Sequence, residues 1–230
     1  MDKIAYIKKE QKRIAGFVAR EFRHYYLTGG TALAFHFDHR FSEDLDFFSQ
    51  KYDSKEADRI MDFIARKTGF PFQLESQQDM PGLVPMKVYF LELKNKAVLK
   101  IDCVQDFVKN IKKPKNGLHS VEDIYYRKIY AATGSKREEG PAGQVIATGR
   151  QSVKDLYDIY YLSSKVKPLS DFFFEYLPYS KIAQLDAWYR GFDKRDVKLE
   201  LVDLVEGIDP NKIFKHLDEE IFKKIPDKLL

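Results

Sequence analysis

The stretch YLTGGTALAFHFDHRFSEDLDFF, residues 26–48, places two adjacent glycines after a short apolar segment and an acidic SEDLD sequence soon after them. Gly29 and Gly30 precede a segment of helical character that ends near Phe37. Glycines at a strand-to-helix turn let the backbone approach an anion closely, and the N–H groups at the start of a helix bind phosphate oxygens. The pattern indicates either an ordinary turn or a phosphate cradle, with the hydroxyl of Thr31 as a further donor.

The acidic pair Asp44 and Asp46 lies in a segment that alternates polar and apolar residues, which is the pattern of a strand. Their carboxylates are therefore expected on one face of that strand, where two like charges repel and raise each other's pKa. A divalent cation relieves this repulsion, and hard oxygen ligands favour Mg²⁺ or Mn²⁺. Asp102, in a later strand, is the candidate third ligand. Three such carboxylates are what two-metal phosphoryl transfer requires.

Each of these features also has a simpler explanation. A Gly-Gly pair after a strand is often only a turn, and an Asp-x-Asp sequence is common on a solvated strand face. Asp102 by itself is equally consistent with an exposed strand residue that pairs with Lys100 or Lys87. The order and spacing of the three features together are much more specific than any one of them.

Taken together, Gly29-Gly30-Thr31 and Ser42-Glu43-Asp44-Leu45-Asp46 resemble the first motif of the polymerase-β-like nucleotidyltransferase superfamily. The whole string is most similar to the AbiEii/AbiGii toxin-type branch. The resemblance implies an α+β minimal nucleotidyltransferase core, a mixed sheet flanked by helices, followed by a helical domain. It implies metal binding by Asp44, Asp46 and Asp102. It also implies nucleotide contacts by Gly29, Gly30, Thr31 and Ser42.

Two later motifs extend the resemblance over roughly residues 24–162. The helical sequence VEDIYYRKIYAA supplies Lys128, and KDLYD matches a Lys-Asp-x-x-Asp helix motif at residues 154–158. The resemblance implies that Lys128 and Lys154 hold the triphosphate and that Asp155 makes another contact there. Asp158, one helical turn after Lys154, is expected to orient that lysine. The alternative is an ordinary ion pair on a helix surface.

Apolar periodicity predicts the regular elements. Helix 54–68 is expected to begin at Ser54 as N-cap and to stop at Gly69, and Asp209-Pro210 to start the last helix. Strand 97–104 should place Leu99, Ile101 and Cys103 on one face. The remaining predicted elements are helices over 4–22, 31–37, 120–132 and 152–165, and strands over 24–27, 44–48 and 86–93.

These elements suggest two domains, a nucleotidyltransferase core over 1–117 and a helical domain over 118–230 that completes the nucleotide cleft. The basic segment 109–117 is expected to be a solvated linker, although its KKPK sequence at 112–115 also suits contact with an RNA backbone. The glycine-rich segment 133–150 is expected to be a loop without regular structure, either a lid over the nucleotide or an incidental surface loop.

Composition points to a folded protein of the cytoplasm. The 230 residues are 44% hydrophobic, with 18 Phe and 14 Tyr, and the net charge is +4. The single Cys103 cannot form an internal disulfide, which suits a reducing compartment. The charged first residues do not resemble a signal peptide, and no segment approaches the roughly 18 apolar residues of a membrane helix. No membrane association is expected.

The expected reaction is metal-dependent transfer of a nucleoside monophosphate from an NTP to an acceptor hydroxyl, with release of pyrophosphate. Asp102 would complete the metal site and help deprotonate the acceptor. By analogy with the toxin branch, the acceptor is a tRNA 3′ end and a cognate antitoxin protein restrains the enzyme. The alternatives are transfer to a protein or small-molecule acceptor, and a regulatory protein that binds NTP without turning it over.

Overall fold

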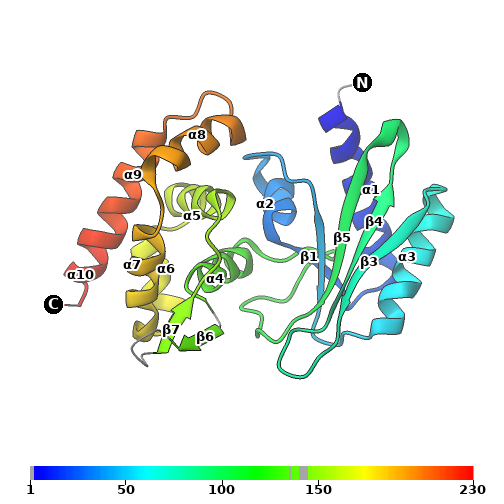
Figure 1. Cartoon of the computed structure of the whole chain (residues 1–230), viewed down its shortest axis with the longest axis horizontal. Coiled ribbons are helices and arrows are strands. Elements are labelled where there is room, and N and C mark those ends of the chain that lie inside the picture. Colours follow the sequence, from blue (N-terminus) through cyan, green and yellow to red (C-terminus); the bar gives the residue numbers. More distant parts are fainter. Residues whose placement is uncertain (1–2, 135, 140–144, 230) are drawn as a thin grey trace. The chain divides into compact units, whose positions relative to one another are not determined.

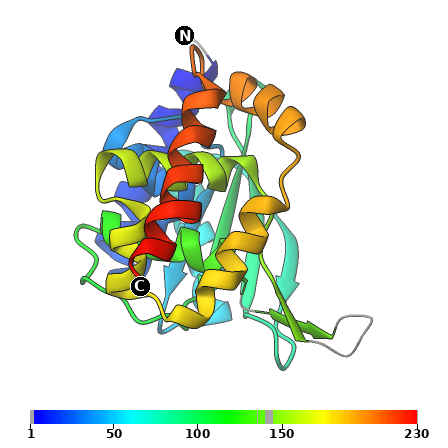
Figure 2. The same cartoon turned by 90° about the vertical axis from the view of Figure 1, so that its left-hand side faces the viewer.

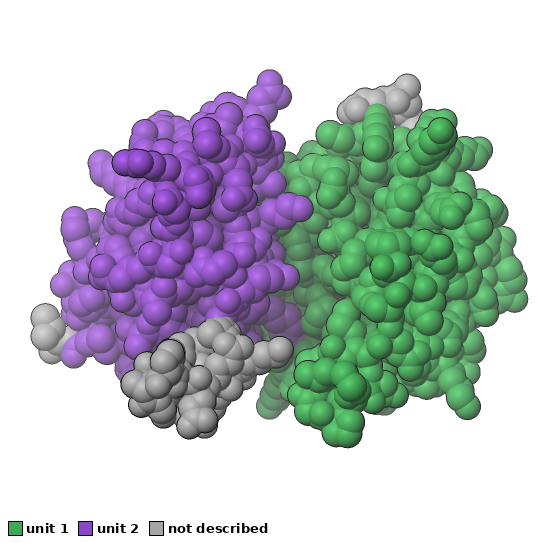
Figure 3. Space-filling model, in the orientation of Figure 1, with its two compact units in different colours: residues 1–124 green, residues 125–230 purple. Residues whose placement is uncertain are grey.

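The computed structural model of the chain describes residues 3–134, 136–139 and 145–229. The chain divides into two compact units, residues 1–124 and 125–230, which Figure 3 distinguishes by colour. The division falls inside helix α4 (Val121–Ala132). None of the helices in the described ranges is long and apolar enough to cross a membrane.

Unit 1 is built on a mixed five-stranded sheet with the order β1-β2-β5-β4-β3 (Figure 1). The central pair β2–β5 is parallel, and the other neighbouring strands are antiparallel. This is the α+β architecture that the resemblance implied. The strands are β1 (Tyr26–Thr28), β2 (Leu45–Ser49), β3 (Phe72–Gln78), β4 (Met86–Glu92) and β5 (Val98–Gln105).

Three helices accompany this sheet: α1 (Lys3–Glu21), α2 (Gly29–Phe37) and α3 (Ser54–Thr68). Helices α1 and α3 lie on the same side of it (Figure 1). The predicted stop of α3 at Gly69 is confirmed, but its predicted N-cap is wrong. The carboxylate of Asp53 accepts the backbone N–H of Lys55, and Ser54 is already the first helical residue.

The alternation predicted for β5 is confirmed, and it separates the core face from the functional face. Leu99, Ile101 and Cys103 are fully buried, whereas Lys100 on the other face is half-buried. Because successive side chains of a strand point to opposite faces, Asp102 shares the face of Lys100.

Strand β3 was not predicted. Its sequence, FQLESQQ, is mostly polar and its residues are largely exposed, so the apolar alternation that reveals a strand is missing. It is an edge strand that pairs only with β4 in the sheet, with an irregularity between Leu74 and Ser76. Backbone pairing with β4, rather than burial of its side chains, stabilises it.

The prediction that the segment 109–117 is a linker is wrong. The segment is a loop that is fixed to unit 1. The N–H of Leu27 in β1 donates to the carbonyl of Gly117 at 2.8 Å, and Lys115 and Leu118 form a tight turn with two backbone hydrogen bonds. Gly117 has φ +69°, and a Cβ there would overlap Ala19 of α1. The loop therefore packs against α1 as closely as backbone permits.

Unit 2 is helical, with α9 crossing α5 in Figure 2. Part of segment 133–150 is regular rather than a loop: β6 (Lys136–Glu139) and β7 (Val145–Thr148) form an antiparallel hairpin, while residues 140–144 lie outside the described residues. The predicted start of α9 at Asp209-Pro210 is confirmed by a hydrogen bond from the N–H of Asn211 to Asp209. The helices after α4 are α5 (Val153–Lys165), α6 (Leu169–Tyr176), α7 (Ile182–Arg190), α8 (Lys194–Leu204), α9 (Pro210–Glu219) and α10 (Ile225–Asp227), with short helical turns at Lys94–Lys96, Tyr179–Lys181 and Glu220–Lys224.

Candidate active site

Sheet register brings the acidic residues of unit 1 together. Asp46 of β2 is opposite Asp102 of the parallel strand β5, and on its other side it is opposite Thr28 of β1. Neighbouring strands are about 4.8 Å apart, so residues in register present their side chains side by side. These three residues form a row across β1, β2 and β5 that carries two carboxylates. Gly29 directly follows the first of them, Thr28, in the chain.

Asp102 is the buried member of the row. One of its oxygens accepts a hydrogen bond of 2.7 Å from Lys100, while Oδ1 is buried and has no hydrogen-bond partner among the described residues. Burial raises the pKa of Asp102 above its usual value, the charge of Asp44 adds to this rise, and Lys100 opposes it. Asp102 is consequently a more basic carboxylate than an ordinary surface aspartate.

Lys100 faces the same group of carboxylates. Burial opposes its protonation, but the hydrogen bond to Asp102 and the charges of Asp102, Asp44 and Asp46 together raise the pKa of Lys100. The three predicted metal ligands therefore share one electrostatic environment. The sequence suggests Lys100 only as a pairing partner that would make Asp102 an ordinary surface residue. The structure places it among the carboxylates instead.

The acidic group suits a hard divalent cation in its chemistry. In the part of the chain that the structure describes, no three acidic, histidine or cysteine side chains converge closely enough to form a complete metal site by themselves. Two carboxylates in register and an unpartnered, buried Oδ1 on Asp102 are nevertheless donors that Mg²⁺ or Mn²⁺ prefers. The donor chemistry of Asp46 and Asp102 therefore suits such an ion, whereas Asp44, Asp46 and Asp102 together do not form a complete three-carboxylate site in the described structure.

Gly29 is in the left-handed region, with φ +72°, and its Cα faces Asp46. A Cβ at this position would lie 2.5 Å from Oδ2 of Asp46, so only glycine leaves room for that carboxylate. The N-cap residue of α2, Thr28, makes no side-chain cap hydrogen bond. The side chain of Thr28 therefore does not compete with an anion for the first N–H groups of this helix.

Gly30 lies beneath two polar side chains from the loop before β2. A Cβ on Gly30 would be 2.6 Å from Nη2 of Arg40 and 3.0 Å from Oγ of Ser42. Arg40 is buried, and its guanidinium offers the forked donor geometry that suits phosphate. Arg40 was not predicted as a site residue. The signal available in the sequence was its position two residues before Ser42, inside the string that carries the resemblance.

Thr31 holds the acidic segment rather than offering its hydroxyl hydrogen to a phosphate. Its Oγ1 donates a hydrogen bond of 2.5 Å to the carbonyl of Asp44, and the residue is buried. This bond ties the first turn of α2 to the start of β2. The amide of Gln11 in α1 donates to the carbonyl of Ser42 at 2.9 Å and fixes the same loop from the other side.

In unit 2, Lys128 and both aspartates of the KDLYD sequence form a buried cluster. Nζ of Lys128 lies 2.6 Å from Oδ1 of Asp155 and 2.7 Å from Oδ2 of Asp158. Arg150 donates to the other oxygen of Asp155 at 2.6 Å. Burial by itself would raise the pKa of Asp155, but Lys128 and Arg150 hold it below its usual value.

Lys154, unlike the buried and paired Lys128, is accessible to a ligand. It is exposed, and among the described residues it forms no ion pair with Asp158. The prediction that Asp158 orients Lys154 is wrong, because Asp158 is fully buried beside Lys128. Positions four apart lie on roughly the same side of a helix, but the short aspartate turns inward while the long lysine extends to solvent.

A mixed sheet with aspartates in register beside a glycine turn is an arrangement that suits nucleotidyl transfer. The model of the family described as nucleotidyl transferase AbiEii toxin, type IV toxin-antitoxin system, matches residues 17–228. The chain belongs to this family, and it is a nucleotidyltransferase. A comparison with curated proteins gives no match.

Solved structures share the fold at low sequence identity. A candidate nucleotidyltransferase from H. pylori is 17% identical, with a TM-score of 0.59 over 100% of this chain and 99% of that one. JHP933 from Helicobacter pylori is 18% identical, with a TM-score of 0.59 over 100% of this chain and 96% of that one. At such identities the likeness establishes the fold alone.

Proposed function

We propose that the chain transfers a nucleoside monophosphate from an NTP to a hydroxyl of an RNA acceptor, with tRNA as the expected acceptor, in the presence of Mg²⁺ or Mn²⁺. The observation that carries this proposal is the alignment of Asp46 and Asp102 in neighbouring parallel strands, with Gly29 packed against Asp46. That alignment gathers carboxylates next to an uncapped helix start, which is the combination that a metal-bound triphosphate requires.

The carboxylates Asp44, Asp46 and Asp102 would hold the metal, which supplies charge stabilisation to the phosphates when bound. The N–H groups after Gly29, with Arg40 and Ser42, would bind phosphate oxygens. The acceptor oxygen attacks the α-phosphorus, the bond from that phosphorus to pyrophosphate breaks, and the hydroxyl proton moves to a base. Asp102 is the candidate base, because burial raises its pKa.

The regulatory context follows from the family. A type IV toxin-antitoxin system pairs a toxin with a separate antitoxin protein, and we infer such a partner for this chain. NTPs and tRNA are found in the cytoplasm, and the free thiol of Cys103 suits a reducing compartment. We therefore expect a cytoplasmic location.

The test is incubation of the purified chain with Mg²⁺, each α-phosphate-labelled NTP in turn, and total cellular RNA, followed by a denaturing gel. Asp46→Asn, which keeps the size of the side chain but removes its charge, is the matched control. Label in a tRNA-sized band with the wild type alone supports the proposal and identifies the base preference. Label in protein instead assigns a protein acceptor. NTP binding without any transfer favours the regulatory alternative.

A further inference from the structure

A basic groove of about 670 Å³ lies on unit 1, between α1, the end of α2 and the loop 109–117. Its lining includes four lysines and no acidic residue. It also contains three rings: the half-buried Phe35, the exposed His36 and the buried His119. The lysines are Lys12, Lys112, Lys113 and Lys115. We call this surface the lysine groove.

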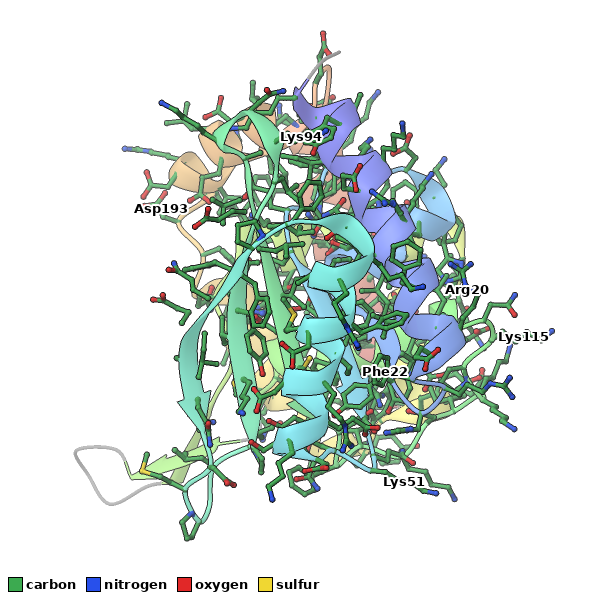
Figure 4. All side chains as sticks on the ribbon, turned by 90° about the vertical axis from the view of Figure 1, so that its right-hand side faces the viewer. Arg20, Phe22, Lys51, Lys94, Lys115 and Asp193 are labelled. Carbon is green, nitrogen blue, oxygen red and sulfur yellow. The ribbon has the colours of Figure 1, made fainter. Side chains whose placement is uncertain are left out.

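Most of this positive charge is not neutralised within unit 1. Lys112 pairs with Glu122 at 2.6 Å. Lys113 and Lys115 are exposed and make no ion pair with any described residue, and the ammonium of Lys12 lies 5.9 Å from the ring centre of Phe35. Figure 4 shows Lys115 extending outward from the ribbon on the side of α1. A concentrated positive potential of this kind attracts polyanions.

The groove is also a fixed structure rather than a collection of surface side chains. Gly117 packs directly on Ala19, and the carbonyl of His119 is hydrogen-bonded to the ring of His36 at 2.9 Å. The loop that carries the lysines is therefore held to both helices that form the walls. A site held in this way binds its ligand at a lower entropic cost than a mobile tail would.

We propose that the lysine groove binds the sugar-phosphate backbone of the RNA that accepts the nucleotide. Lysines provide contacts to phosphates, and the rings of Phe35 and His36 provide surfaces on which unpaired bases stack. These rings favour RNA over an acidic protein, which would need only the charges.

The groove is close to the candidate active site along the chain and in space. It includes Leu27, two residues before Gly29, and it ends at His36, seven residues further along α2 and about 10 Å away at the rise of an α-helix. This inference rests on the proposed function, since it assigns the surface that positions the acceptor.

The test measures RNA binding directly and without NTP. A fluorescein-labelled single-stranded RNA and labelled tRNA are titrated with the full chain, and binding is followed by fluorescence anisotropy at several salt concentrations. The double variant Lys113→Gln, Lys115→Gln is compared with Lys94→Gln, Lys96→Gln. The control pair has the same spacing and exposure, lies on the turn between β4 and β5, and Lys94 is well separated from Lys115 in Figure 4.

We expect the groove variant to bind RNA roughly tenfold more weakly and to lose about 1.4 from the salt slope, as two phosphate contacts to a single strand predict. The control pair should bind like the wild type, and circular dichroism melting should be the same for all three proteins. Unchanged affinity of the groove variant would overturn the inference, and so would equal competition by polyglutamate, which would indicate an acidic protein ligand instead.

The active-site variant Asp46→Asn separates this inference from the proposed function. It should bind RNA as tightly as the wild type although it transfers no nucleotide. If the wild type transfers no nucleotide to RNA but the groove variant still loses RNA affinity, the groove is an RNA site and the proposed reaction is wrong. If transfer to RNA occurs and the groove variant binds and transfers normally, the groove inference alone is wrong.

Discussion

Lys128 donates a hydrogen bond of 2.6 Å to Asp155, and both side chains are buried. A second carboxylate, that of Asp158, lies 2.7 Å from the same ammonium. Lysine and aspartate are rarely buried unless they are paired, so each of these groups depends on the others. The lysine that the family resemblance implied as a triphosphate ligand thus has an internal structural role in unit 2.

Removal of Lys128 should destabilise the chain strongly. Lys128→Met keeps the length and packing of the side chain but leaves two buried carboxylates without their ammonium. The expected loss is about 3–5 kcal/mol of unfolding free energy, which is typical when one partner of a buried ion pair is removed. Urea denaturation followed by circular dichroism measures it, and a midpoint close to that of the wild type would contradict the structural role.

Lys154→Met is the matched experiment at an exposed lysine. Its effect on unfolding free energy should be within about 0.5 kcal/mol, as for most surface substitutions. If Lys154 contacts the triphosphate, as predicted, the variant should bind NTP roughly tenfold more weakly, which corresponds to the loss of one charge-assisted hydrogen bond. Titration calorimetry with a non-hydrolysable NTP decides this, and an unchanged Kd removes Lys154 from the site.

Asp102→Asn should abolish transfer and stabilise the fold at neutral pH. The pKa of Asp102 is raised in the folded chain, so folding favours its protonated form. Its contribution to stability is complete below the usual aspartate pKa and is lost as the pH rises through the raised value. The unfolding free energy of the wild type should therefore fall over that pH range, and that of the variant should fall less. Above the raised pKa, the variant should be more stable than the wild type by on the order of 1 kcal/mol.

The measurement is a series of urea denaturation curves from acidic to neutral pH for both proteins. Asp58→Asn is a useful comparison, because Lys87 and Tyr89 hold the pKa of Asp58 below its usual value despite the opposing effect of burial. That substitution should lower stability at neutral pH. A similar pH dependence for the wild type and Asp102→Asn would show that the pKa of Asp102 is not raised in the folded chain.

Gly29→Ala should remove activity because its new methyl group occupies the place of the Asp46 carboxylate. The left-handed backbone adds about 1–2 kcal/mol of strain for a residue with a Cβ. Gly30→Ala is the comparison, since Gly30 has no left-handed backbone and its methyl group would meet the side-chain ends of Arg40 and Ser42 rather than the Asp46 carboxylate. Transfer rates at saturating NTP should fall much further for Gly29→Ala than for Gly30→Ala, and equal losses would contradict the packing argument.

Arg40→Lys tests the residue that sequence reasoning missed. A lysine keeps the charge but loses the forked donor geometry, so NTP affinity should fall roughly tenfold, while Arg40→Ala should lose more. Because Arg40 is buried, thermal melting must accompany the binding measurement. Normal NTP affinity in a folded Arg40→Ala variant would show that the guanidinium serves only the structure of the loop.

Patterns within a few residues of one another are determined by the sequence itself. The alternation of β5, the end of α3 at Gly69 and the start of α9 at Asp209-Pro210 follow from backbone periodicity and capping, which depend only on neighbouring residues. The motif around Asp44 and Asp46 is local in the same sense, and it was sufficient to indicate the family.

Tertiary structure alone decided the contacts between distant segments. The sequence did not reveal that Asp158 faces Lys128 rather than Lys154, that Arg40 lies over Gly30, or that the loop 109–117 packs on α1. Strand β3 escaped prediction for the same reason, since its stability comes from pairing with β4. Such contacts depend on the register and packing between elements. The pattern of residues along the chain does not show which charged side chain from another element will pair with a buried charge.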